Sequence, residues 1–298
     1  MKKFNTGPSA FRALRTLLLC ALIGLLAACS SVRLTYNHGD TLLYWWLDAY
    51  VDLDAGQKAG VKQDIDDLFQ WHRQTQLKDY AQLLAHGQQR LQGNVTPADL
   101  LADYGEVKKR VRTLLLKAEP DLAKLARTLR PEQIEHMEKK FASNNDTYRK
   151  KFLRGGAEKR QQVRFEKAMD QFELWFGNFS REQEQLIRKA SDARPLGNEI
   201  WFDERLRRQR NIVNLVRKVQ REQLGQDATQ ALVHQLIEDS FARLENSERK
   251  PFFDAYNEAT AQMVATVIKI ATPVQKAHAA KRMQGWIDDF NAMAAGQR

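Results

Sequence analysis

The chain has 298 residues, of which 28% are charged and 9% aromatic, and its formal net charge at pH 7 is +10. Glycine and proline are scarce, with 15 and 7 residues, and Ala, Leu, Gln, Glu, Lys and Arg dominate, which favours helices. Two cysteines exclude a fold held by several disulfide bonds, and the length is ample for a sizeable core.

The N-terminus has the organisation of a secretory signal. Basic residues precede an apolar run over 17–28, and at 12 residues this run is shorter than the roughly 20 needed to span a bilayer. Residues 26–29 are Leu-Ala-Ala-Cys, which resembles a lipobox, the motif that leaves a cysteine at the new N-terminus for acylation. We therefore predict that residues 1–28 are a lipoprotein signal peptide and that Cys29 carries the lipid. The alternative is an ordinary signal peptide cut nearby, with Cys29 incidental.

Removal of the signal would leave Cys29 as the only cysteine, because Cys20 lies in the removed segment, and would lower the net charge to +6. Ser30 follows Cys29 where an aspartate would retain a Gram-negative lipoprotein at the inner membrane, so the sequence resembles the default for transfer to the outer membrane. No later apolar run reaches about 18 residues. We expect a lipidated tether over 29–39 and one helical domain over 40–298, at the periplasmic face of the outer membrane.

Residues 40–298 carry a helical pattern throughout. Prolines such as Pro120 and Pro131 suit the first turn of a helix, and no strand-like alternation of any length occurs. The short linkers between these segments predict an all-α, antiparallel multi-helix bundle, with Gly155-Gly156 as its best hinge. Helices are predicted over 40–50, 55–92, 97–118, 121–128, 131–153, 157–178, 180–192, 198–224, 227–247 and 251–292, the last one ended or kinked at Pro273.

Three of the helix starts share a short motif. Residues 53–57 (Leu-Asp-Ala-Gly-Gln), 129–133 (Leu-Arg-Pro-Glu-Gln) and 179–183 (Phe-Ser-Arg-Glu-Gln) each have an apolar residue, a cap residue, two more residues and then glutamine. An apolar residue before the cap can pack on the first turn, and glutamine at the third position closes a capping box. The spacings of 76 and 50 residues exclude a solenoid period.

The charge is unevenly distributed. Residues 40–70 hold seven acidic and two basic residues. Residues 139–167 hold three acidic and ten basic residues, and residues 205–221 hold seven basic residues and no acidic one. Because an exported protein meets little nucleic acid, the expected partners are an envelope protein or an anionic lipid or glycan. The alternative is a solvated helix face or an intramolecular match of charge. The candidate anion-binding residues are Arg205, Arg207, Arg208, Arg210 and Arg217.

Residues 64–73 contain three carboxylates, a histidine and an arginine, the densest group of side chains that could form a metal or acid–base site. A metal pair on a helix needs a spacing of three or four residues, whereas Asp66 and Asp67 lie five or six residues before His72. No metal site and no cofactor are therefore expected. Asp64, His72 and Arg73 remain a candidate polar site, and the alternative is a buried histidine that bonds a carboxylate from another helix.

Enzymatic motifs are missing from the sequence. It contains no Gly-x-Ser-x-Gly, no glycine loop for phosphates and no cysteine nucleophile. We therefore expect a non-enzymatic binding or scaffolding module. The alternative is an enzyme that acts on peptidoglycan or lipid with a site around His72.

An aromatic cluster follows the predicted anchor: Tyr36, Tyr44, Trp45, Trp46 and Tyr50. Tyrosine and tryptophan favour membrane interfaces, so the helix over 40–50 could lie on the bilayer. The favoured interpretation places Trp45 and Trp46 in the core, because nearby aspartates would oppose an anionic surface.

Several of these motifs coincide in an uncharacterised family of Gram-negative lipoproteins that the chain resembles: Tyr36-Asn37, Trp45-Trp46, Leu53 with Gln57, Trp71-His72-Arg73 and Leu77 with Tyr80. That resemblance implies no activity and no catalytic residue. The helix starts also resemble the Leu-Thr-x-x-Gln motifs of Spy-type periplasmic chaperones, which implies a chaperone-like role. Here, however, the second position is Asp54, Arg130 or Ser180 and never threonine.

Overall fold

The computed structural model describes residues 31–297, except for the side chains of Ser31 and of residues 243–246. The predicted signal peptide and Cys29 therefore lie outside the described residues. Within 31–297 the chain forms 12 α-helices, one short π-helix and no strand, which confirms the all-α class. The helices are α2 (Ser31–Asn37), α3 (Gly39–Val51), α4 (Ala55–Thr75), α5 (Leu77–Arg90), α6 (Pro97–Thr128), α7 (Pro131–Tyr148), η1 (Arg149–Leu153), α8 (Ala157–Phe176), α9 (Arg181–Asp192), α10 (Asn198–Glu222), α11 (Gln226–Asn246), α12 (Lys250–Ile270) and α13 (Pro273–Ala294).

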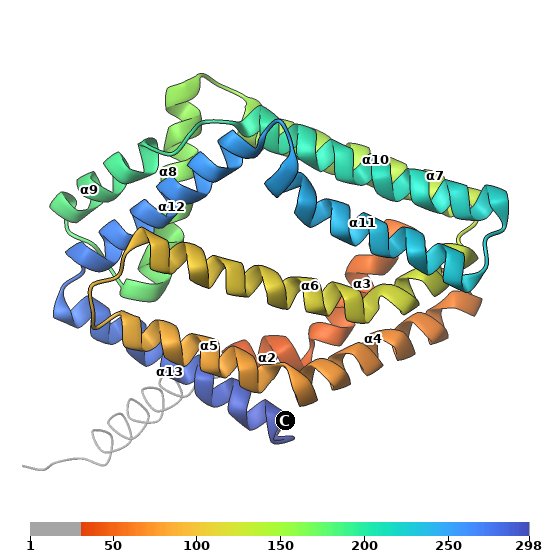
Figure 1. Cartoon of the computed structure of the whole chain (residues 1–298), viewed down its shortest axis with the longest axis horizontal. Coiled ribbons are helices and arrows are strands. Elements are labelled where there is room, and N and C mark those ends of the chain that lie inside the picture. Colours follow the sequence, from red (N-terminus) through yellow and green to blue (C-terminus); the bar gives the residue numbers. More distant parts are fainter. Residues whose placement is uncertain (1–30, 298) are drawn as a thin grey trace, which may run out of the picture.

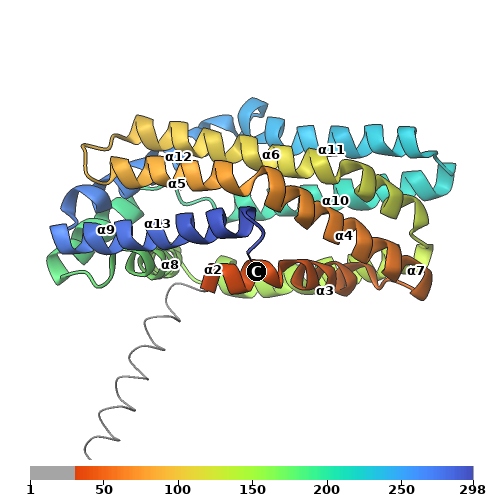
Figure 2. The same cartoon turned by 90° about the horizontal axis from the view of Figure 1, so that it is seen from below.

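Helices that are distant in sequence lie side by side. Helix α5 runs along α13, and α6 packs against both α11 and α12 (Figure 1). Seen edge-on, the molecule is flat, with α6, α11 and α12 in one layer (Figure 2). The opposite layer contains α2, α3, α7 and α8, and α3 contacts α7 directly.

The core is divided between the two ends of the molecule. One cluster joins α3, α4, α6, α7 and α10 around buried residues such as Val61 and Ile134. A second joins α8, α9, α12 and α13 around Ile187 and Val267. A smaller cluster around Ala123 connects α6 with α11. Each cluster is built from apolar residues at helical spacing, as the sequence pattern indicated.

Two predicted helix boundaries differ from the structure, and a third is confirmed. The segment over 55–92 is two helices that meet at Gln76, and the fully buried Leu77 starts the second one. The break lets α4 pack on α3 and α6 while α5 turns along α13. Conversely, 97–128 is one helix that contains Pro120, because the buried stripe at Ala123 and Ala126 continues after it. Pro273 begins α13, and the predicted break before it is confirmed.

Two further differences lie at the ends of other segments. The segment over 29–39, predicted as a tether, contains the helix Ser31–Asn37, which packs on α13. The segment over 131–153 is α-helical only to Tyr148 and then forms the π-helix η1. Gly155 follows η1 with φ +83°, a left-handed conformation that glycine adopts without strain, so the predicted hinge position is a sharp turn before α8.

Candidate functional site

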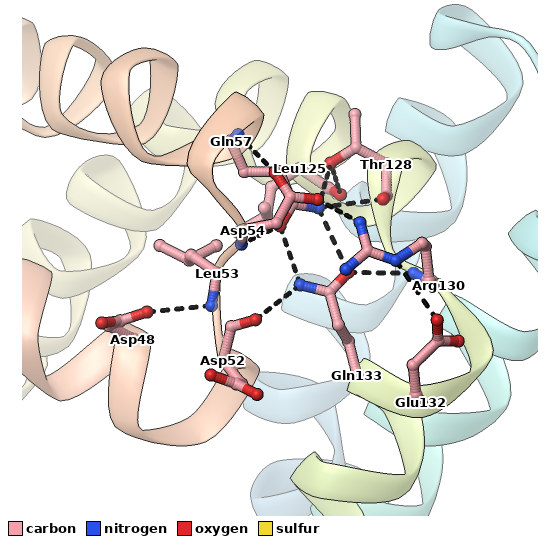
Figure 3. Close-up of polar contacts among 10 residues, drawn as sticks. All are labelled: Asp48, Asp52, Leu53, Asp54, Gln57, Leu125, Thr128, Arg130, Glu132 and Gln133. Carbon is pink, nitrogen blue, oxygen red and sulfur yellow. Dashed lines mark hydrogen bonds and ion pairs between the residues drawn. The ribbon is translucent and has the colours of Figure 1, made fainter.

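The starts of α4 and α7 face each other and are joined by their capping glutamines (Figure 3). In α4, the Gln57 backbone N–H donates to Asp54 Oδ1 at 2.9 Å and the Asp54 N–H donates to Gln57 Oε1 at 3.0 Å, which completes a capping box. In α7, the Arg130 N–H donates to Gln133 Oε1 at 3.0 Å. Both glutamines therefore use their carbonyl oxygen within their own helix start and keep their NH2 group for the other one.

Those NH2 groups cross between the helix starts. Gln57 Nε2 donates to the backbone carbonyl of Thr128 and Gln133 Nε2 to that of Asp52, each at 2.9 Å. The two side chains also donate to each other, at 3.3 Å from Gln57 and 2.7 Å from Gln133. We call this arrangement a glutamine clasp. Arg130 adds an ion pair with Asp54, and its guanidinium lowers the pKa of that carboxyl.

A second glutamine clasp joins the starts of α9 and α13. Gln183 Nε2 donates to the carbonyl of Ile270 at 2.8 Å, and Gln275 Nε2 donates to that of Asn178 at 2.7 Å. The two amides again donate to each other, at 2.9 and 3.2 Å. In both clasps the accepting carbonyl lies two residues before the N-cap of the opposite helix.

Sequence reasoning found three of the four clasp motifs and missed the fourth. The fourth spans 271–275, Ala-Thr-Pro-Val-Gln, and its first position is the small residue Ala271 instead of a large apolar one. The signal that could have found it is the cap followed by proline and then glutamine, which it shares with 129–133. All four residues that precede the N-caps are buried: Leu53, Leu129, Phe179 and Ala271.

The residue four positions after each clasp glutamine is buried in both halves of the molecule. Val61 and Ile187 lie four residues after Gln57 and Gln183, and both are core residues. Met137 and Ala279 hold the same position after the other two glutamines and are also buried. The two halves therefore repeat one unit, two helix starts clasped together. Because the motif is committed to these internal bonds, it does not by itself indicate client binding.

His72 lies inside an aromatic cluster. Its Nδ1 is 2.9 Å from the hydroxyl of Tyr36, and its ring lies 5.8 Å from Tyr36 and 5.1 Å from Tyr80 between centroids. Burial lowers the pKa of His72, and burial also raises the pKa of Tyr36 to about 12. The hydrogen-bond partner of His72 is thus a tyrosine of α2 and not a carboxylate.

Of the other two members of the predicted polar site, Asp64 is bonded elsewhere and Arg73 contacts the same tyrosine as His72. Asp64 accepts hydrogen bonds from Lys124 Nζ at 2.8 and 3.1 Å. Arg73 lies over the ring of Tyr36, 5.6 Å from its centroid. An open groove beside α4 is lined by Asp66, Gln70 and Arg73 with the end of α13, and His72 is not part of its lining. Among residues 31–297, no three His, Cys, Asp or Glu residues are grouped as metal ligands.

Three of the five candidate anion-binding arginines have internal partners. Arg205 Nε donates to Asn145 at 2.8 Å, Arg207 pairs with Glu204 at 2.8 Å, and Arg217 pairs with Glu138 at 2.7 Å. Arg208 and Arg210 are exposed. Arg205 and Arg217 therefore link α10 to α7, whereas Arg207 pairs within α10, and only part of the run is free to meet a ligand.

The aromatic cluster on α3 is divided between core and surface. Tyr44 is buried, whereas Trp45 and Trp46 are 62% and 58% exposed. The interpretation that placed both tryptophans in the core is therefore wrong, because the core-facing positions of this helix are Tyr44 and Val51. Leu34 on α2 and Leu42 on α3 are also largely exposed. We call Leu34, Leu42, Trp45 and Trp46 the apolar face.

A basic segment over 139–159 is also open to solvent. Exposed and without an ion pair in the described part of the chain are Lys139, Lys150, Lys151, Arg154 and Lys159. They lie on α7, η1 and the start of α8. We call these five residues the basic rim. None was singled out from the sequence, although the excess of positive charge over 139–167 pointed to their region.

The profile of a family of unknown function, DUF6279, matches residues 49–239 of this chain. No curated protein and no solved structure matches it. The matched region begins within α3 and contains the first clasp and the Gln183 half of the second. No helix among residues 31–297 is both long enough and apolar enough to cross a membrane.

Proposed function

This chain belongs to DUF6279, a family of unknown function, so the family implies no activity. From the surface and the sequence of the chain itself, we propose the following function. The protein is a lipid-anchored, non-enzymatic binding or scaffolding module of the cell envelope, held through Cys29 at the periplasmic face of the outer membrane. The observation that carries this proposal is the apolar face, which begins on the first helix after the lipobox.

The apolar face is unusual for a protein that is free in water. Single exposed apolar residues are common, but two adjacent exposed tryptophans with two exposed leucines on neighbouring helices are typical of a contact surface. Leu34 lies five residues after Cys29 in the sequence. An acyl chain on Cys29 would hold this surface close to the bilayer, where tryptophan is favoured.

A non-enzymatic role is supported by the arrangement around His72. A general base needs a reactive proton within hydrogen-bond reach, and the Nδ1 of His72 is already occupied by the Tyr36 hydroxyl. Asp64 is held by Lys124. The two glutamine clasps meanwhile join helix starts that are 76 and 92 residues apart, as expected for a stiff scaffold.

Acylation of Cys29 is the direct test. Cells that express the tagged full-length protein are grown with radiolabelled palmitate and then separated into membrane and periplasmic fractions. The wild type should carry label and sediment with the outer membrane, and the Cys29→Ser variant should carry none. Cys20→Ser is the matched control, because it replaces a cysteine inside the predicted signal and should leave labelling intact. A wild type without label, or label that persists in Cys29→Ser, would overturn the proposal.

A further inference from the structure

We propose that the layer formed by α2, α3, α7 and η1 is the face with which the protein lies on an anionic phospholipid bilayer. This inference rests on the proposed function, since Cys29 would bring this layer to the membrane. It adds the orientation of the domain and the chemistry that holds it, an apolar contact next to a basic one.

Helix α3, which carries most of the apolar face, lies against α7, which leads into the basic rim. Trp46 packs on Tyr50 at 4.9 Å between centroids, and Lys140 of α7 lies over the same Tyr50 ring at 5.9 Å. Asn144 Nδ2 donates to the Tyr50 hydroxyl at 2.7 Å. Helices α3 and α7 are therefore fixed side by side, and Figure 2 places both in the same outer layer.

Three of the five basic-rim residues lie in the π-helix η1 or directly after it. Lys150 and Lys151 lie within η1, and Arg154 follows it. Arg149 in the same turn is paired with Asp146, and Arg160 is paired with Glu199, whereas Glu158 is exposed and has no ion pair in the described chain. The basic rim therefore keeps a net positive charge, with five basic residues against one exposed carboxylate of Glu158. A juxtamembrane basic residue near an anionic surface strengthens binding markedly, and several act together.

Of the three aspartates near the tryptophans, Asp52 is exposed and Asp48 and Asp54 have partners inside the protein. Asp48 accepts a hydrogen bond from the Leu53 N–H at 2.8 Å, where α3 ends. Asp54 is paired with Arg130, and Asp64 is paired with Lys124. The negative charges of Asp54 and Asp64 are therefore paired inside the protein, and phospholipid headgroups would meet the free lysines and arginines of the basic rim.

The experiment measures binding of the mature chain, residues 29–298 with Cys29→Ser, to sedimented vesicles. Every core residue lies between Tyr44 and Met293, so this chain keeps the whole packed core. Vesicles of phosphatidylglycerol are compared with vesicles of phosphatidylcholine. We expect binding to the anionic vesicles, weakened by salt, and little binding to the neutral ones.

Two variants and one control locate the contact. The triple variant Lys150→Glu, Lys151→Glu and Arg154→Glu should bind phosphatidylglycerol at least about tenfold more weakly. Trp45→Ser with Trp46→Ser should weaken binding at both low and high salt, because it removes apolar contact. The matched control is Lys109→Glu with Lys117→Glu and Lys269→Glu, exposed lysines of α6 and α12 in the opposite layer, and it should change binding by less than about twofold.

Thermal unfolding of each variant distinguishes loss of the binding surface from loss of the folded structure. Failure of the unlipidated chain to bind phosphatidylglycerol would overturn this inference, as would equal losses from the control and the basic-rim variant. Neither result bears on acylation of Cys29, which palmitate labelling tests independently. If the wild type carries no label but the unlipidated chain still binds vesicles, the lipid anchor is contradicted and the membrane-binding face is supported.

Discussion

The side-chain amides of Gln57 and Gln133, 76 residues apart, donate hydrogen bonds to each other's carbonyl oxygens. Each amide also caps its own helix and reaches the backbone ahead of the other, to Thr128 and Asp52. Gln133 is only 3% exposed, so its polar atoms depend on these partners instead of on water. The two glutamines thus provide hydrogen-bond partners for the backbone at both helix starts and fix the position of one start relative to the other.

Removal of one clasp glutamine should leave the opposite helix start with unpaired groups. We expect Gln133→Ala to lower the free energy of unfolding by about 2 kcal/mol, because the Asp52 carbonyl and the Gln57 amide lose their partner. The double variant with Gln57→Ala should cost about 1 kcal/mol less than the sum of the single changes. Urea titrations followed by circular dichroism provide all four values.

The control for this cycle is Gln63→Ala, an exposed glutamine of α4 that bonds only Asp67 one turn away. It should change stability by no more than about 0.5 kcal/mol. Additive effects of Gln57→Ala and Gln133→Ala would show that the two side chains act separately and that the clasp is not an energetic unit.

The second clasp allows a test of its donor group. Gln275→Glu keeps the oxygen that accepts from the Thr272 N–H but loses the NH2 group that donates to Asn178. At neutral pH the new carboxylate would face a backbone carbonyl, so this variant should be less stable than Gln275→Ala. Burial should raise the pKa of this carboxyl above its usual value of about 4.3.

Acid should therefore reverse that order. Once protonated, the new carboxyl group can donate again, so Gln275→Glu should gain stability relative to Gln275→Ala as the pH falls below about 5. Unfolding titrations of both variants at matched pH measure this difference directly. A difference that does not change with pH would mean that the Asn178 contact contributes little.

The sequence predicted the elements of this fold better than their pairing. Helical spacing and capping motifs are local, so the helix starts at Ala55, Pro131 and Arg181 could be located from the residues alone. That the glutamines of these starts meet in pairs depends on contacts across 76 and 92 residues, which no local pattern encodes. The continuous α6 was missed because tertiary packing outweighs the local effect of Pro120.

The candidate site was predicted in part for similar reasons. The apolar stripe of Ile65 and Leu68 placed His72 on the inner face of its helix, and the residue is half-buried there. Its partner Tyr36 was not predicted, because residues 31–37 were assigned to a tether instead of a helix. The sequence also could not predict which way the Trp45 side chain points. Adjacent aromatic residues point to different sides of a helix, and only tertiary packing decides which side is covered.

Replacement of the exposed tryptophans should leave the fold intact. Trp45→Ser and Trp46→Ser should each change the free energy of unfolding by less than about 1 kcal/mol, because these side chains are mostly in water. Tyr44→Ala on the same helix is the matched contrast and should cost about 3 kcal/mol, since it opens a cavity in the core. Thermal and urea unfolding measure both, and a large loss from either tryptophan would show that the apolar face is covered in solution.

The environment of His72 makes stability depend on pH. Burial lowers its pKa in the folded protein, whereas in the unfolded chain the value is about 6.5. As the pH falls through that value, the unfolded state takes up a proton that the folded state does not, so the free energy of unfolding decreases.

His72→Phe isolates this contribution from that of the many carboxylates, which titrate in both proteins. The variant keeps a ring against Tyr80 but has no proton to gain, so it should lose less stability between about pH 7 and pH 5 than the wild type. The quantity to measure is the free energy of unfolding of the wild type minus that of the variant, at a series of pH values and constant salt. It should decrease as acid is added and level off once the folded protein also protonates. If the difference instead stays constant or increases toward low pH, His72 is not held neutral by its aromatic surroundings.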